Sequence, residues 1–98
     1  MAQTEIPIDL PKRSDLTSAG ALRKTLLTAE VGVVLRAGEV ELLTSPVLQV
    51  LMAARRDYGE RGRDITLVAA SSAFDDCLTV LGASRGDICT IDRVGTAQ

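Results

Sequence analysis

The segment from residue 40 to residue 52 reads Val40-Glu41-Leu42-Leu43-Thr44-Ser45-Pro46-Val47-Leu48-Gln49-Val50-Leu51-Met52. Its apolar first part stops at a Thr-Ser-Pro junction, and apolar residues then return with helical spacing. This pattern predicts that Ser45 is the N-cap of a helix and that Pro46 takes the first helical position. The Ser45 hydroxyl would lie near the surface among unpaired backbone N–H groups, either as an inert cap or as a phosphate acceptor.

The residues on either side of this junction predict a buried strand before it and a helix after it. Residues 31–35 form a short β-branched run without alternation, which is typical of a central strand covered on both faces. Residues 39–43 then lead into the helix, which should end around Gly59 and Gly62. Its apolar stripe comprises Val47, Leu51, Ala54 and Tyr58.

The N-terminal part of the chain predicts a strand followed by a helix. Apolar residues at 6, 8 and 10 alternate with Glu5, Pro7 and Asp9, as in a half-buried strand whose proline is best tolerated at a sheet edge. After a polar turn over residues 11–15, we expect Thr17 to cap a helix over residues 18–28. Its buried face would comprise Ala19, Leu22, Leu26 and Ala29, with Arg23 and Lys24 in water.

The C-terminal third of the chain again predicts strands and a helix in alternation. Residues 65–69 predict a strand, and Ser71 or Ser72 should cap a third helix that ends at Gly82 in the left-handed conformation. Residues 88–91 predict a short final strand. The apolar positions of this helix recur at i, i+3, i+4 and i+7: Phe74, Cys77, Leu78 and Leu81.

Strand and helix alternate three times, which is the pattern of right-handed β-α-β crossovers. We therefore expect residues 1–98 to form a single α/β domain, a mostly parallel mixed sheet with helices packed on it, with weakly ordered ends at residues 1–4 and 93–98. The Ser45 junction should lie at the carboxyl end of a strand, which is the edge of α/β sheets where binding sites cluster.

Composition excludes several classes of partner. With one Phe, one Tyr and no Trp, the core must be aliphatic and no aromatic platform is available for single-stranded nucleic acid. The net charge of −2 gives no general attraction to nucleic acid or anionic membranes. No apolar run approaches the ~20 residues of a membrane span, and the N-terminal residues do not resemble a signal peptide, so we expect a cytoplasmic protein.

The residue types needed for catalysis or metal binding are scarce. The chain has no histidine, and Cys77 and Cys89 are too far apart in sequence for a CxxC motif, so we expect two buried thiols, no metal and no cofactor. Neither a glycine-rich phosphate loop nor a Gly-x-Ser-x-Gly motif is present. Asp75 and Asp76 fit a helix N-terminus better than an active site, so we expect no enzyme activity.

At this junction the chain resembles a known family. Residues 42–51 resemble the strand-to-helix signature of STAS domains, the fold of anti-sigma factor antagonists. The order and spacing of residues 33–35, 53–56, Gly62, residues 65–68 and residues 73–82 extend the resemblance from about Ile6 to Gly82. The Ser45-Pro46 sequence and the Leu48-Gln49-Val50-Leu51 run are most similar to the chemotaxis-associated branch of the family.

The resemblance implies a regulatory switch in which a partner kinase phosphorylates Ser45. The family pattern is Asp-Ser-Ser-Gly, or Asp-Thr followed by a small residue or proline, whereas this chain has Thr44 in place of the aspartate and Val47 in place of the small residue. In this interpretation the protein partner, a serine kinase, an anti-sigma factor or another signalling protein, binds at Thr44, Ser45, Pro46, Val47 and Gln49.

Other interpretations of the same residues stay open at this point. In the alternative interpretation, Ser45 is only a helix cap, Thr44 is a strand-end residue that satisfies backbone groups, and Gln49 is a solvated surface residue. An arginine cluster at residues 55, 56, 61 and 63 could bind an anion or merely complement the end of a helix dipole. The whole domain could instead be a constitutive STAS subunit bound to the ATPase of a bacterial lipid transporter.

Overall fold

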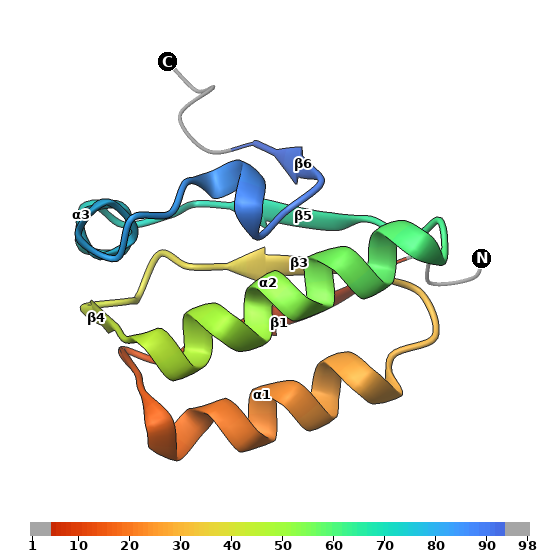
Figure 1. Cartoon of the computed structure of the whole chain (residues 1–98), viewed down its shortest axis with the longest axis horizontal. Helices are drawn as coiled ribbons and strands as arrows, with labels where there is room; N and C mark the ends of the chain where they lie inside the picture. Colours follow the sequence, from red (N-terminus) through yellow and green to blue (C-terminus); the bar gives the residue numbers. More distant parts are fainter. Residues whose placement is uncertain (1–4, 94–98) are drawn as a thin grey trace.

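The structure, a computed structural model, describes residues 5–93 (Figure 1). In this part of the chain four strands form a parallel sheet in the order β1-β3-β5-β6: β1 (Glu5–Asp9), β3 (Gly32–Arg36), β5 (Ile65–Val68) and β6 (Ile91–Asp92). A second, two-stranded parallel sheet consists of β2 (Arg13–Ser14) and β4 (Leu42–Leu43). The helices are α1 (Leu16–Thr28), α2 (Ser45–Glu60), α3 (Ser72–Val80) and a 3₁₀ turn, η1 (Arg85–Asp87).

This arrangement confirms the predicted α/β class with a mostly parallel sheet and helices packed on it. Figure 1 shows α1 and α2 running side by side along the sheet, with α3 crossing near the ends of the strands. Every strand pair that the structure describes is parallel. Residues 1–4 and 94–98, most of the ends expected to be weakly ordered, lie outside the described residues; Arg93 donates its N–H to the Leu67 carbonyl at 2.9 Å.

The hydrophobic core lies between the sheet and the helices. The strand register places Val33 beside Ile65 and Leu35 beside Leu67, and all four side chains are fully buried. The predicted stripe of α2 packs into the same core: Val47, Leu51, Ala54 and Tyr58 are buried. The predicted buried face of α1, including Leu22 and Leu26, is confirmed as well.

The other face of the sheet is less covered than predicted. Val34 of β3 is half-buried and Pro7 of the edge strand β1 is exposed, so the prediction of a central strand covered on both faces is wrong for this side. Thr66 is fully buried here, and its hydroxyl donates to the Glu5 carboxylate at 3.4 Å. The side chain of Glu5 reaches it across β3 at Gly32, which has no side chain.

Helix α1 begins earlier than predicted, because its N-cap is Asp15 and not Thr17. The Asp15 carboxylate accepts hydrogen bonds from the Thr17 N–H at 3.1 Å and from the Thr17 hydroxyl at 2.6 Å. In return, the Ser18 hydroxyl lies 3.0 Å from the Asp15 N–H, which completes a capping box. The predicted polar turn before it contains the short strand β2.

The ends of α2 and α3 agree with the glycines that predicted them, whereas the boundaries near the C-terminus differ from the prediction. Gly62 and Gly82 both have positive φ angles, +69° and +80°, and terminate α2 and α3; α2 runs past Gly59 to Glu60. Ser71 is the N-cap of α3 and accepts from the Phe74 N–H at 3.0 Å. The predicted strand over residues 88–91 is wrong in extent, because η1 precedes it and only Ile91 and Asp92 pair with β5.

The two cysteines differ in burial. Cys89 is buried, and its thiol donates to the Arg85 carbonyl at 3.1 Å, while burial raises the pKa of this thiol. Cys77 is only half-buried, so the expectation of two buried thiols is wrong for this residue. Its sulfur accepts a hydrogen bond from the Leu43 N–H at 3.4 Å, which ties α3 to β4.

Tyr58 links the C-terminal ends of α1 and α2. Its hydroxyl is buried and donates to the Leu26 carbonyl at 2.7 Å, one of the last carbonyls of α1. Burial raises the pKa of this phenol. Tyr58→Phe keeps the ring but leaves the carbonyl unsatisfied, so we expect the free energy of unfolding to fall by about 1–2 kcal/mol. Urea denaturation followed by circular dichroism measures this change, and an unchanged midpoint and slope would contradict it.

Candidate functional site

The candidate site is built where two helices begin side by side. The pairing of β2 with β4 sets Ser14 beside Leu43, and a helix starts directly after each strand. The Ser14 carbonyl accepts from the Thr44 N–H at 3.1 Å and from the Thr44 hydroxyl at 3.5 Å. Thr44 therefore satisfies backbone groups at the end of a strand, as one sequence interpretation had it. The N-termini of α1 and α2 lie next to each other at this edge.

Ser45 is the first residue of α2 and is exposed, so its predicted place as N-cap is wrong by one residue. The N-cap is Thr44, whose side chain makes no capping hydrogen bond, and Pro46 follows Ser45. The first hydrogen bond of the helix runs from the Leu48 N–H to the Thr44 carbonyl at 3.1 Å. The N–H groups of Ser45 and Val47 precede this bond and are not capped by a side chain.

The predicted partner-binding residues divide into two groups. Ser45 and Gln49 are exposed, and Thr44 and Pro46 are half-buried, so all four reach the surface at the start of α2. Val47 is 1% exposed and packs in the core. The structure therefore does not bring Val47 to the surface on which the other four residues lie.

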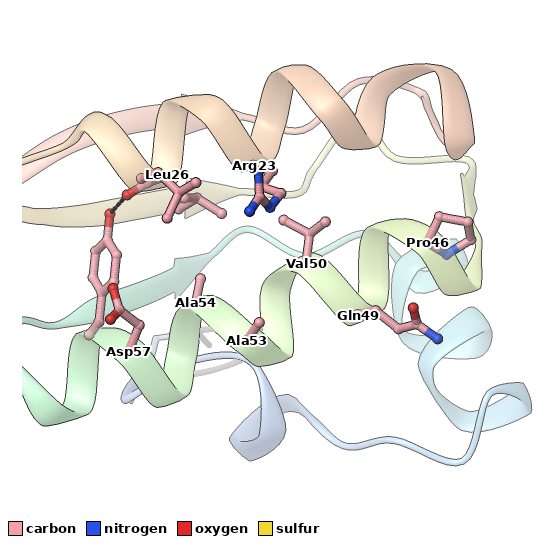
Figure 2. Close-up of a pocket in the computed structure, with 10 residues that line it drawn as sticks. Arg23, Leu26, Pro46, Gln49, Val50, Ala53, Ala54 and Asp57 are labelled. Atoms are coloured by element: carbon pink, nitrogen blue, oxygen red, sulfur yellow. Dashed lines mark hydrogen bonds between the residues drawn. The ribbon is translucent and has the colours of Figure 1, made fainter.

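A groove between α1 and α2 extends from this junction, and it is not among the sites predicted from the sequence. It has a volume of about 450 Å³ and lies between Pro46 at one end and Asp57 at the other (Figure 2). Its α2 side is a helical stripe that the spacing of residues 46, 49, 50, 53, 54 and 57 could have indicated. The α1 side consists of Arg23, Leu26 and Leu27.

One carboxylate at this edge comes from the neighbouring turn. Asp15, the N-cap of α1, follows the strand that pairs with β4, so it lies beside the turn that carries Thr44. The Thr17 hydroxyl, which donates to this carboxylate, holds its pKa below the ordinary value. Asp15 is therefore ionised at neutral pH, next to a position where the family pattern has an aspartate and this chain has Thr44.

Three of the four arginines near the end of α2 each bind a different structural partner, and Arg56 lines a surface pocket beside Arg55. Arg55 donates to the Gly86 carbonyl at 3.0 Å, and Arg63 donates to the Ala29 carbonyl at 2.8 Å. Arg61, the C-cap of α2, pairs with Asp57 of this helix at 3.3 Å. Each of these three side chains has its own structural partner, so the anion-site interpretation receives no support from their arrangement.

The acids of α3 also have a structural role. Asp75 lies in the first turn of α3 and accepts two hydrogen bonds from Arg85, at 2.9 and 2.6 Å. This pair ties α3 to η1. Within residues 5–93 no group of three or more acidic, cysteine or histidine residues is arranged to hold a metal ion.

The parallel four-stranded sheet with three helices is consistent with a STAS-type domain. The protein family described as "Mlab, STAS domain" matches residues 5–91, and the chain belongs to this family. No curated protein and no solved structure gave a significant match. STAS domains are typically non-catalytic regulatory or binding domains that mediate contacts between proteins. In residues 5–93, no helix is both long and apolar enough to cross a bilayer.

Proposed function

We propose that this domain is a non-catalytic, cytoplasmic adaptor that binds a protein partner and is switched by phosphorylation of Ser45, in anti-sigma factor antagonism or chemotaxis-associated signalling. The observation that carries the proposal is the exposed Ser45 hydroxyl at the uncapped start of α2. A kinase can reach this side chain without unfolding the domain. The half-buried Thr44 and Pro46 and the exposed Gln49 surround it with a surface of mixed polarity.

The physical basis of the switch is a change of charge that the free domain tolerates and the complex does not. A phosphate adds about −1.5 to −2 charges at the positive end of the α2 dipole, near uncapped N–H groups. A partner surface complementary to a neutral hydroxyl would have to desolvate this dianion, which costs several kcal/mol unless a cation compensates it. Phosphorylation therefore turns binding off while the fold stays intact.

The first test is the phosphorylation itself. The domain is purified from cells of its source organism and analysed by mass spectrometry, in the wild type and in Ser45→Ala. We expect one phosphate on Ser45 in a fraction of the wild-type molecules and none in the variant. Ser72→Ala is a matched control, because Ser72 is also exposed and is also the first residue of a helix. Phosphate on Ser72 and not on Ser45 would contradict the proposal.

The second test is the effect on binding. A partner captured by the wild-type domain is titrated against Ser45→Asp and Ser45→Ala. We expect Ser45→Asp to weaken binding at least tenfold, which corresponds to about 1.4 kcal/mol, and Ser45→Ala to bind like the wild type. Ser72→Asp should have no effect on the affinity. Equal affinities of Ser45→Asp and Ser45→Ala would refute the switch.

A constitutive role is the second candidate, and two observations favour it. The matching family is described as the STAS domain of Mlab, and Thr44 stands where switchable STAS domains carry an aspartate. In this role the domain is a permanent subunit on the ATPase of a lipid transporter. Stable co-purification with an ATPase that is insensitive to Ser45→Asp would favour this role over the switch.

A further inference from the structure

The groove between α1 and α2 combines an apolar floor with exposed apolar walls. Val50, Ala54 and Leu26 form its inner part, and Ala53 on α2 is exposed (Figure 2). The small side chains of Ala53 and Ala54 leave room for another element to approach the backbone of α2. The groove begins at Pro46, so it is continuous with the surface around Ser45.

The exposed stripe of α1 continues the apolar surface. Leu16, Gly20, Arg23 and Leu27 follow one another at i, i+4, i+7 and i+11, so they lie on one side of the helix. Leu16 is 73% exposed and Leu27 is 53% exposed, which is high for two leucines on one helix face. Leu27 itself lines the groove.

The backbone of the walls restricts what can fill this groove. Past the first turn of α2, the main-chain groups that line the groove are paired within their helices or, at Leu26, with the Tyr58 hydroxyl, so the groove offers no open strand edge to an extended peptide. An α-helix satisfies its own backbone hydrogen bonds, so it can fill such a groove without pairing to the groove's main chain. Two helices running side by side provide the surface on which a third helix packs by ridges into grooves.

The charged side chains along the groove indicate which charge the occupant carries. Arg23 points into the groove near its middle (Figure 2), and within residues 5–93 its guanidinium makes no hydrogen bond or ion pair. Asp57 on the opposite wall is already paired with Arg61 at 3.3 Å. We therefore expect the occupant to place a carboxylate against the unpaired guanidinium of Arg23. A second copy of this chain, docked by the same surface about a two-fold axis, would bring two Arg23 side chains together and is disfavoured.

We propose that the groove between α1 and α2 docks an amphipathic α-helix of a protein partner, with apolar residues against Leu27 and Val50 and a carboxylate facing Arg23. The inference rests on the proposed adaptor function and identifies the segment that the adaptor recognises. The bound helix extends to Pro46, where a phosphate on the adjacent Ser45 would meet its end. The groove thus supplies the affinity, and Ser45 controls it.

The test uses a displayed library of peptide segments that covers the proteins encoded by the source organism, selected against the wild-type domain. We expect the selected segments to be amphipathic helices with an acidic residue among apolar residues at i, i+3, i+4 and i+7. Fluorescence anisotropy then measures their affinities. Leu27→Lys should weaken binding at least tenfold. Arg23→Glu should also weaken binding at least tenfold, and changing the acidic residue of the peptide to lysine should restore it.

Val80→Lys is the matched control, because Val80 is an apolar residue that is 84% exposed on a different helix, α3. We expect it to bind the selected segments like the wild type. A central proline in the peptide should abolish binding, because it breaks the helix. Circular dichroism of each domain variant checks that the fold is retained.

Several results would overturn the inference. These are the recovery of no segment, the recovery of extended peptides only, and equal binding by Leu27→Lys and the wild type. A wild-type dimer in sedimentation that Leu27→Lys dissociates would mean that a second copy fills the groove. If a partner captured through Ser45 binds Leu27→Lys normally, the groove inference fails and the adaptor function stands. If helices bind the groove equally in Ser45→Asp, the switch fails and the groove inference stands.

Discussion

Replacing Leu51 by alanine is expected to lower the free energy of unfolding by about 2–5 kcal/mol, the range for truncating a buried leucine. Leu51 is 0% exposed and lies on the buried stripe of α2, in the core between this helix and the sheet. Truncation removes apolar contacts and leaves a cavity that close-packed neighbours fill only in part. Urea denaturation followed by circular dichroism gives the change directly.

Met52 provides the control for this substitution. It is the next residue of the same helix, its side chain is 38% exposed, and Met52→Ala changes helix propensity little. We expect Met52→Ala to change stability by less than about 1 kcal/mol. If both variants lost the same stability, the orientation of α2 on the sheet would be wrong, and with it the outward direction of Ser45 and the groove.

Replacing Gly32 by alanine is expected to destabilise the protein by about 1–3 kcal/mol, the range for overpacking. A Cβ atom at Gly32 would lie 2.7 Å from the Asp64 carbonyl oxygen, which is closer than such atoms approach in proteins. That oxygen accepts the hydrogen bond from the Val33 N–H at 3.0 Å. Because the obstructing atom belongs to the backbone, β3 and the turn before β5 must shift to accommodate the methyl group.

Gly20→Ala makes the same chemical change with the opposite expected sign. A Cβ atom at Gly20 meets nothing within 4 Å, and the residue is exposed in the middle of α1. Alanine favours the helix there, so stability should rise by about 0.5–1 kcal/mol. Thermal melts of the two variants, side by side with the wild type, measure both effects. Similar shifts of the melting temperature in the same direction would show that a backbone clash does not determine the effect of Gly32→Ala.

These predictions bear on function because the same framework places the candidate site. Ser45 is exposed because the stripe that contains Val47 and Leu51 packs against the sheet, which leaves the opposite side of α2 in solvent. The junction is also held by the Ser14 carbonyl, which anchors Thr44, and by Cys77, which accepts from Leu43. A loss of binding by a surface variant is therefore informative only when its stability is unchanged.

Local sequence patterns were sufficient to predict the order of the three helices and the longer strands and most of the core, but not β2 or η1. The helical spacing of Val47, Leu51, Ala54 and Tyr58 correctly indicated which face of α2 is buried. Gly62 and Gly82 marked helix ends because a positive φ is easily adopted by glycine. Helix starts were harder to predict, because Thr44 and Ser45 are both acceptable caps by residue type. The hydrogen bond from the Thr44 N–H to the Ser14 carbonyl, in another element, helps to place Thr44 at the boundary.

The sequence by itself determined the alternation of strands and helices, the apolar face of each helix and the Thr-Ser-Pro junction, because these depend on the spacing of neighbouring residues. Only the tertiary structure decided that β2 and β4 bring two helix starts together and that Arg23 and Val50 meet in one groove. Those features join residues far apart in the chain, and their positions are set by how whole elements pack, which local periodicity does not encode.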